Sequence, residues 1–427
     1  MNSFDLSGQI KKYLDRHLSD YLTLLEQMVA VNSFTANPVG VNELGQMTAQ
    51  IFSDLDFVAE TVQSVDALYG KHLILTREGR SRDGRPVPKI GLVSHLDTVF
   101  PADEELRNNF EWREEGERIY GPGVVDIKGG TIVIYMILSA LQALAPDVFE
   151  AITWIVLLDA TEETGGQDFG RLCVQRLGAE ALACLVFEPG NWSGNRPHLV
   201  VARKGMVVYR IEVEGKAAHA GSSHAKGANA VLQMADVIKR ICSMTDYERD
   251  LTYNVGTVAG GTVINRVPHF AAASVEMRAF QMDVFEEGIA NMLALNKLST
   301  VTTANGEYAC RVKAKVLHQV LPWPRNGRTD DLFDLWRETA ESLGYDAVPE
   351  ERAGLSDGNF FWEELPTLDG LGPAGGNAHC SERSADGSKD QEYVLASTFV
   401  PKAHLNSMAL LRLVQERFVS GTEAAAS

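Results

Sequence analysis

The chain has 427 residues, of which 45% are hydrophobic, and its formal net charge is -18. This length allows a large packed core, most naturally divided between two domains. The strong negative charge argues against nucleic acid or an anionic membrane surface as a partner.

The first part of the chain alternates between helical and strand-like patterns. Apolar residues at helical spacing predict helices at residues 6–31 and 42–55. Apolar runs predict strands and later helices in the following places: strands at 73–75, 89–94, 152–158 and 183–187, helices at 130–144 and 169–177. This alternation is typical of an α/β domain with a mostly parallel sheet.

The middle of the chain has a different pattern. It predicts, in order, strand 206–213, helix 229–242, strands 252–258 and 270–280, helix 283–298 and strand 311–316. The order β-α-β-β-α-β indicates a small split βαβ, ferredoxin-like α+β domain. Helices predicted at residues 330–343 and 403–418 resume the pattern of the first part of the chain. We therefore expect residues 204–317 to be inserted into a discontinuous domain made of residues 1–203 and 318–427.

The cysteines and the N-terminal residues indicate a cellular location. The five cysteines lie far apart with no CxxC pair, which suits reduced, buried thiols. The first residues lack the apolar stretch of a signal peptide, and no later run is expected to span a bilayer. We therefore expect a cytoplasmic protein.

Two polar residues end the apolar run 89–94. His95 and Asp97 are two apart, and a strand places such residues on the same face. His95 can therefore bind a metal while Asp97 orients its ring. Taken alone, a histidine at a strand end is more often an ordinary hydrogen-bonded polar residue than a metal ligand. Asp126 lies in a glycine-rich loop at a helix entrance, where an N-cap is the simplest interpretation.

Further acidic residues follow the later strands. Glu162 and Glu163 come directly after the run 152–158, where both carboxylates are partly desolvated unless a cation neutralises them. A dinuclear metal centre solves this problem, since one carboxylate binds metal and its neighbour moves protons. Glu188 ends the next strand and His379 lies in a glycine-rich loop. Two histidines and three carboxylates suit a pair of zinc-like ions.

As a set, these motifs resemble the M20 metallopeptidase family. SHLDTV, YGPGVVDIKGG, TEETGG, FEPG, GKAAHAG and GNAHC occur in that order. The resemblance runs from about residue 20 to residue 415 and is nearest to the glutamate carboxypeptidases. Aminoacylases, acetylornithine deacetylase and succinyl-diaminopimelate desuccinylase belong to the same family. The family implies a zinc-peptidase-type catalytic domain interrupted by a lid and dimerisation domain.

The resemblance also implies roles for the polar residues. It supplies five ligands for two divalent ions, most simply Zn²⁺ with Co²⁺ or Mn²⁺ as alternatives: His95, Asp126, Glu163, Glu188 and His379. Asp126 bridges the ions, His95 and Glu188 complete one site, and Glu163 and His379 complete the other. Glu162 is then the general base and Asp97 the partner of His95. The resemblance further implies a cis peptide bond between Asp126 and Ile127.

Four residues outside the metal centre match substrate-contacting positions of the family. His219, in GKAAHAG, resembles a lid histidine that reaches the active site of the partner subunit. Asn265 and Arg278 match residues that hold the substrate carboxylate, a task that suits the planar fork of arginine. Gly354 matches a member of a substrate-contact loop.

The resemblance implies a homodimer formed by the inserted domain. Segments 206–213 and 229–242 are expected to supply an edge strand and a helix to a two-fold interface. At the domain boundary, Arg203 and Lys204 are expected on the surface, with contact to a second acid on the substrate as the alternative.

We therefore expect a dizinc amidohydrolase that cleaves an N-acyl or N-aminoacyl amino acid with a free carboxylate, as in carboxypeptidase release of a C-terminal glutamate. A deacylase of the aminoacylase or acetylornithine type is the alternative within this class. A non-catalytic binding protein on the same scaffold is a remote alternative, since every ligand and the base are present. Neither GxGxxG nor GxxxxGK[ST] follows the first strands, which argues against a nucleotide-binding protein.

Overall fold

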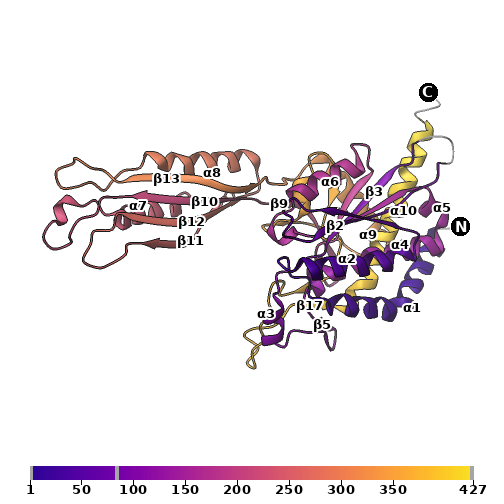
Figure 1. Ribbon diagram of the computed structural model, residues 1–427. Helices are drawn as coiled ribbons and strands as arrows, with labels where there is room; N and C mark the ends of the chain where they lie inside the picture. Colours follow the sequence, from indigo (N-terminus) through magenta and orange to yellow (C-terminus); the bar gives the residue numbers. More distant parts are fainter. Residues whose placement is uncertain (1–2, 82–85, 424–427) are drawn as a thin grey trace. The chain divides into compact units, whose positions relative to one another are not determined.

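The computed structural model describes residues 3–81 and 86–423. The chain divides into two compact units, each with its own hydrophobic core (Figure 1). The first unit comprises Met1–Val201, Arg325–Glu350 and Ser356–Ser427, and the second comprises Ala202–Pro324 and Glu351–Leu355.

A six-stranded sheet forms the centre of the first unit. Its strands lie in the order β1 (Val58–Gln63), β2 (Lys71–Arg77), β6 (Thr153–Asp159), β3 (Lys89–His95), β7 (Ala183–Val186) and β15 (Thr367–Leu368). β3 runs parallel to β6 and β7, and β15 runs parallel to β7. β1 and β2 are antiparallel to their neighbours, so the sheet is mixed. β3 and β6 end side by side, with His95 paired to Asp159.

Helices cover both faces of this sheet. Successive residues of its buried strands point to opposite sides, so each strand has apolar side chains on both faces for the helices to bury. Leu92 and Val156 face one helical layer, whereas Val93 and Leu157 face α6 (Gln167–Leu177). The first layer contains α1 (Ser3–Val29), α2 (Pro38–Ser53), α4 (Gly129–Leu144), α9 (Gly327–Ser342) and α10 (Phe399–Glu423). The expected α/β architecture is confirmed.

Two expectations were wrong, one about the length of apolar runs and one about the burial of the cysteines. The segment Val124–Leu144 is long and apolar enough to cross a membrane by length and composition, although no such run was expected. Because 89% of its apolar window is buried inside the structure, α4 is placed as a core helix. The five cysteines are free, but Cys242 and Cys380 are exposed rather than buried.

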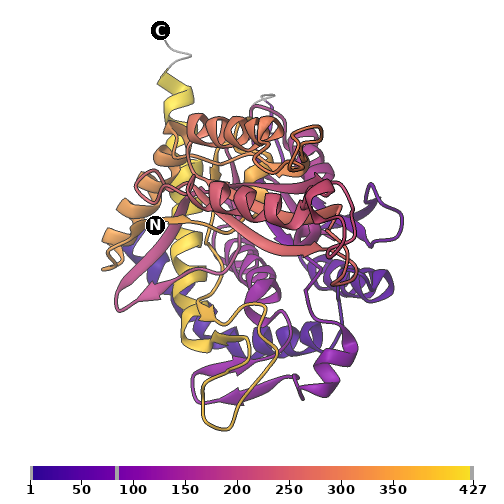
Figure 2. The ribbon, with the colours of Figure 1, turned by 90° about the vertical axis from the view of Figure 1, so that its left-hand side faces the viewer.

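The second unit confirms the predicted β-α-β-β-α-β order. Its elements are β10 (Gly205–Glu214), α7 (Ala230–Cys242), β11 (Thr252–Gly260), β12 (Phe270–Ala279), α8 (Met282–Ala294) and β13 (Arg311–Val320). The antiparallel sheet has the order β11-β12-β10-β13, and both helices share one core with it (Figure 2). β10 pairs on both sides, so the expectation that 206–213 forms an edge strand was wrong; β11 and β13 are the edges.

A small sheet of the first unit was not predicted. Its order is β16 (Gly375–Gly376), β17 (Tyr393–Leu395), β5 (Arg118–Tyr120) and β4 (Arg113–Glu115). It supports both ends of the segment that carries His379. The other short elements are α3 (Ala102–Arg107), α5 (Pro146–Glu150), β8 (Trp192–Ser193), β9 (Arg196–Arg203) and β14 (Val348–Arg352).

Candidate metal centre

His95 closes β3 and is only 3% exposed. Its Nδ1 lies 2.9 Å from the backbone carbonyl oxygen of Asp97, and its Nε2 lies 3.2 Å from Asp126 Oδ1 and 3.8 Å from Glu188 Oε1. One ring nitrogen is thus fixed by the backbone while the other faces carboxyl groups. Metal-binding histidines are oriented in this way.

The Asp97 side chain has more than one partner. Its carboxylate lies 3.5 Å from His95 Nδ1 and accepts hydrogen bonds from the Thr35 hydroxyl at 2.7 Å and from the backbone N–H groups of Glu162 and Glu163 at 3.1 and 3.3 Å. Asp97 therefore orients the turn that carries both glutamates as well as the ring of His95.

Asp126 lies in a tight turn, Val124–Lys128, directly before α4. The Asp126–Ile127 peptide bond is cis, as the family resemblance implied. The two carboxyl oxygens of Asp126 face different histidines: Oδ1 lies 3.2 Å from His95 Nε2 and Oδ2 lies 3.3 Å from His379 Nε2. This is the arrangement that a bridging carboxylate needs.

Glu163 completes the group. Its Oε2 lies 3.2 Å from His379 Nε2, whereas its buried Oε1 has no hydrogen-bond partner among the described residues. A buried carboxyl oxygen without a partner costs free energy unless a cation satisfies it. The ligand atoms of His95, Asp126 and Glu163 all lie within 4.8 Å of one another. The donor set therefore fits divalent metal ions.

The five expected ligands thus converge at the carboxyl end of the sheet. Glu188 contacts His95, His95 contacts Asp126, Asp126 contacts His379, and His379 contacts Glu163. His379 takes a left-handed backbone conformation, with φ of 66°, on the loop after β16.

The histidines share hydrogen bonds with carboxyl groups, which shifts their pKa values upward. Burial alone lowers the pKa of His95, but its hydrogen bonds to Asp126 and Asp97 outweigh burial and raise it. Hydrogen bonds to Asp126 and Glu163 raise the pKa of His379 to about 11. Burial by itself raises the pKa of Asp126, whereas both histidines lower it below its usual range. Metal binding at these nitrogens displaces protons and depends on pH.

Glu162 stands beside this group, and no hydrogen bond among the described residues joins its carboxyl group to a histidine nitrogen. Burial raises its pKa well above the usual value; nearby His95 opposes this, while the charges of Glu188, Glu163 and Asp126 add to it. A raised pKa makes the carboxylate of Glu162 a stronger proton acceptor, which suits a general base.

In the second unit, two arginines hold the segment that contains Gly354. Arg278 donates to the Ala353 carbonyl at 2.7 Å and pairs with Glu276 at 2.7 Å. Arg203 donates to the carbonyls of Gly354 and Leu355 at 3.1 and 2.8 Å. The structure thus brings Arg278 and Gly354 together.

The expectation that the two boundary cations lie on the surface was wrong. Arg203 is 4% exposed and Lys204 is 6% exposed. Lys204 donates to the backbone carbonyl of Asp250 at 2.8 Å and lies over the ring of Phe280. Both cations are therefore engaged within the protein.

His219 and Asn265 lie together on neighbouring loops of the second unit. Ala220 N donates to the Asn265 carbonyl at 2.9 Å. His219 Nδ1 accepts from the backbone N–H groups of Gly221 and Ser222, both at 3.1 Å. Because Nδ1 is an acceptor, the neutral ring carries its proton on Nε2 and presents a hydrogen-bond donor.

These two groups of residues lie at opposite ends of the same sheet. Arg278 pairs with Met206 at the start of β10, whereas Glu214, at its end, pairs with Phe270 and leads to the His219 loop. At about 3.3 Å per residue, the strand separates them by roughly 25–30 Å. Within one copy of the second unit, His219 and Asn265 therefore cannot contact the same small molecule as Arg278.

Glu392 is a site-adjacent residue that the sequence did not reveal. It is fully buried, and its carboxyl group accepts from the backbone N–H groups of both Asp126 and His379. No apolar run, glycine-rich loop or histidine marks its segment, so the sequence offers no signal for it.

A protein-family model described as peptidase family M20/M25/M40 matches residues 91–399, well over half of the chain. The chain belongs to this M20 family. Enzymes of this family are metal-dependent peptidases and related amidohydrolases. All five expected metal ligands lie inside the matched range.

Relatives of this M20 enzyme carry two kinds of name. Carboxypeptidase G2 from Pseudomonas sp. (strain RS-16) is 28% identical over 61% of this chain, and the match spans 60% of that relative's length. An acetylornithine deacetylase from Edwardsiella ictaluri is 25% identical over 84% of this chain and 91% of its own length.

Solved structures share the fold at low sequence identity. A tripeptidase from Staphylococcus aureus aligns with a TM-score of 0.74 at 19% identity, covering 93% of this chain and 99% of its own. Aminopeptidase PepT from Bacillus cereus gives a TM-score of 0.71 at 20% identity, with the same coverage. At these identities the likeness concerns the fold alone.

Proposed function

We propose that this M20 enzyme uses two divalent ions, most simply Zn²⁺, to hydrolyse the amide bond of an N-acyl or N-aminoacyl amino acid with a free carboxylate. The observation that carries the proposal is the Asp126 carboxylate, whose two oxygens lie 3.2 and 3.3 Å from His95 and His379. Glu163 Oε1 beside them has no hydrogen-bond partner within the described part of the chain, which supports a cation at the same place. His95 and Glu188 would hold one ion, Glu163 and His379 the other.

The protein side chains would then carry the proton transfers. When bound, two such ions polarise a carbonyl and lower the pKa of a water from about 16 toward 7. Glu162 accepts the proton of that water and later gives it to the leaving amine. Asp97 fixes the backbone of Glu162, so the base stays at one position. The Nε2–H of His219 donates to the oxyanion of the tetrahedral intermediate.

The substrate carboxylate is assigned to Arg278 and Asn265. The Arg278 guanidinium donates to both carboxyl oxygens of Glu276, to Met206 Sδ and to the Ala353 carbonyl. Of its five N–H groups, one has no partner among the described residues and can donate to a ligand. Gly354 lies in the same segment and is exposed, with room for a substrate to approach its backbone. We favour carboxypeptidase-like activity, with a deacylase as the second candidate, because relatives of both names match.

We further propose a homodimer through the second unit, which acts as lid and dimerisation domain. Because His219 and Asn265 lie far from Arg278 within one sheet, a second copy would have to supply them. The edge strand β11 is exposed over most of its length, and α7 beside it exposes Val231 and Leu232. We assign the interface to β11 and α7, in place of the central strand β10. The five free cysteines support a reducing, cytoplasmic location.

A substrate panel tests this function. Metal-loaded protein is incubated with dipeptides, including ones that end in glutamate, and with N-acetyl amino acids, with and without EDTA. Cleavage that EDTA abolishes and Zn²⁺, Co²⁺ or Mn²⁺ restores supports the proposal, and the preferred group separates carboxypeptidase from deacylase. Binding of panel members without any cleavage by protein that holds two ions would favour a binding protein.

A further inference from the structure

One buried carboxyl group contacts both the turn that carries Asp126 and the loop that carries His379. Glu392 Oε1 accepts from the backbone N–H groups of Val125 and Asp126 at 3.0 and 3.2 Å. Glu392 Oε2 accepts from the backbone N–H of His379 at 3.4 Å. The two oxygens of one side chain therefore fix the main chain at a bridging ligand and at a histidine ligand.

The backbone of Glu392 adds a fourth connection. Its N–H donates to the carbonyl of Cys380 at 2.7 Å, so the residue after His379 is also fixed. Glu392 is fully buried. Buried polar groups keep their hydrogen bonds because an unpaired one costs about 1–3 kcal/mol. A change in the distance between the two loops would therefore break hydrogen bonds of Glu392.

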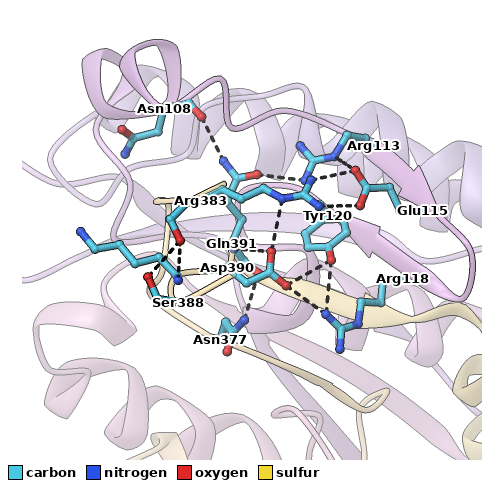
Figure 3. A network of polar contacts seen from close by, with 12 residues as sticks. Asn108, Arg113, Glu115, Arg118, Tyr120, Asn377, Arg383, Ser388, Asp390 and Gln391 are labelled. Atoms are coloured by element: carbon cyan, nitrogen blue, oxygen red, sulfur yellow. Dashed lines mark hydrogen bonds and ion pairs between the residues drawn. The ribbon is translucent and has the colours of Figure 1, made fainter. Parts of the chain in front are cut away.

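The segment that leads to Glu392 is anchored on the β4–β5 hairpin (Figure 3). Gln391, 1% exposed, donates through Nε2 to the carbonyls of Ser381 and Asn108 at 2.9 and 3.0 Å. Arg383 makes two hydrogen bonds to Glu115, at 2.7 and 2.8 Å.

Asp390 joins the same network from the other side. It accepts from Arg118 at 2.9 Å and from the Tyr120 hydroxyl at 3.2 Å (Figure 3). These contacts fix the residues immediately before Glu392, so the carboxyl group is held by a rigid support rather than by a free loop.

Asp97 holds other ligand-bearing segments of the centre in the same way. It accepts from the backbone N–H groups of Glu162 and Glu163, and lies beside His95. Asp97 thus organises His95 and the turn with Glu162 and Glu163, and Glu392 organises the segments of Asp126 and His379. Outer hydrogen-bond partners of this kind change metal affinity or activity by about 10–100-fold when they are replaced.

We propose that Glu392, braced by Gln391, is a positioning residue that sets the spacing of Asp126 and His379 for metal binding. The inference rests on the proposed two-ion site. Replacement by glutamine keeps the size of the side chain but converts one accepting oxygen into a donor. Whichever way the amide turns, either the Asp126 loop or the His379 loop loses its acceptor.

The test is the dissociation constant of each metal ion, measured by competition with a chelator on Glu392→Gln protein. At least one ion should bind about 10–100-fold more weakly than in the wild-type protein. Asp369→Asn is the matched control, since Asp369 is also fully buried but accepts from the Ser356 hydroxyl and Gly370 N, neither of which belongs to a proposed metal ligand. Its metal affinity should stay within about twofold of wild type, well below the change expected for an outer-shell partner.

Two further measurements keep the test decisive. The gain in melting temperature on adding metal compares loaded and metal-free protein of the same variant, so general destabilisation cancels. If Glu392→Gln does not fold, Gln391→Ala removes the brace instead and should weaken metal binding in the same direction.

Unchanged affinity in the variant that folds, or an equal loss in Asp369→Asn, would overturn the positioning role. A wild-type protein that binds a single ion would overturn the two-ion proposal instead. The affinity for that one ion would still decide the role of Glu392.

Discussion

Adjacent glutamates at the end of β6 have different surroundings although the sequence makes them look alike. Glu163 reaches His379 with one oxygen and leaves the other without a partner among the described residues. The Glu162 side chain has no hydrogen bond to a histidine among the described residues, and its backbone N–H donates to Asp97. This difference favours metal binding by Glu163 and proton transfer by Glu162.

Substitution of each glutamate separates the two roles. Glu162→Gln should leave metal content near that of wild type, about two ions per chain, while kcat falls by at least about 10²-fold. Glu163→Gln should instead lower metal content, measured by elemental analysis after dialysis. Equal loss of metal in both variants would show that the two roles are assigned wrongly.

A second buried cluster of the first unit lies behind the sheet end. His72, 1% exposed, lies 3.0 Å from Asp159 and 3.1 Å from Asp168. Burial alone lowers the pKa of His72, but its hydrogen bonds to the two carboxyl groups outweigh burial and raise it to about 9. Burial raises the pKa of Asp168, but its hydrogen bonds to His72 and to the Val65 N–H lower it to about 2.

The raised pKa of His72 predicts a loss of stability in mild alkali. The folded protein binds this proton more tightly than the unfolded chain, so the contribution is complete below about pH 6.5 and is lost as pH rises through about 9. Asp168 acts at the acid end of the pH range. Its contribution to stability is present above about pH 3.8 and is lost as pH falls through about 2.

The free energy of unfolding, measured with urea at about pH 6 and about pH 9.5, tests this expectation. His72→Gln should reduce the difference between the two pH values by about 1–3 kcal/mol. His404→Gln is the control, because burial lowers rather than raises the pKa of His404. A pH profile that His72→Gln leaves unchanged would contradict the assignment.

At the scale of elements, burial decides what could be predicted from sequence. β3 and β6 are buried along nearly their whole length, so continuous apolar runs reveal them. β1 is exposed and β4 has three residues, so neither carries a periodic pattern. The alternation in β10 indicates one buried face but does not name the neighbouring strands, which is why its central position was missed.

The same limit applies to the metal centre. His95 and Glu163 could be predicted because strand ends and family motifs mark them. Glu392 could not, since its role depends on two loops that only the folded chain brings together. Sequence reasoning finds the residues that perform the chemistry more readily than those that hold them in place.

The start of α4 must approach the end of β7 closely. A Cβ atom at Gly130 would lie 2.1 Å from the Phe187 carbonyl oxygen, a backbone atom that cannot move alone. Gly130→Ala should therefore lower the free energy of unfolding by about 1–3 kcal/mol through overpacking. Metal binding should weaken as well, because Phe187 directly precedes Glu188.

Gly8→Ala provides the matched control for this substitution. Gly8 lies in α1, and a Cβ atom there would have no neighbour within 4 Å, so alanine should stabilise the helix by about 0.5–1 kcal/mol. Urea denaturation of both variants measures the change in the free energy of unfolding, which should be negative for Gly130→Ala and positive for Gly8→Ala. A neutral or stabilising Gly130→Ala would mean that α4 and β7 can separate without cost.

At the scale of the whole molecule, the second unit carries the residues that we assign to the substrate at both ends of one sheet. Arg278 lies at the end where β10 begins, and His219 and Asn265 lie beyond the end of β10. One chain cannot apply both ends of a sheet to one small substrate. The proposed homodimer resolves this, because each active site would then use His219 of the other chain.

Subunit complementation tests this arrangement directly. His219→Ala and Glu162→Ala proteins should each be inactive, because each homodimer lacks either the oxyanion donor or the base in both sites. After subunit exchange, a hybrid dimer contains one site with Glu162 from the first protein and His219 from the second. About a quarter of the wild-type rate is expected from an equal mixture, since half of the dimers are hybrids and each has one intact site. Mixing His219→Ala with the double variant His219→Ala/Glu162→Ala is the control, and it should stay inactive. Exchange that is demonstrated by mass spectrometry without recovery of activity would place His219 in its own chain's site or outside the reaction.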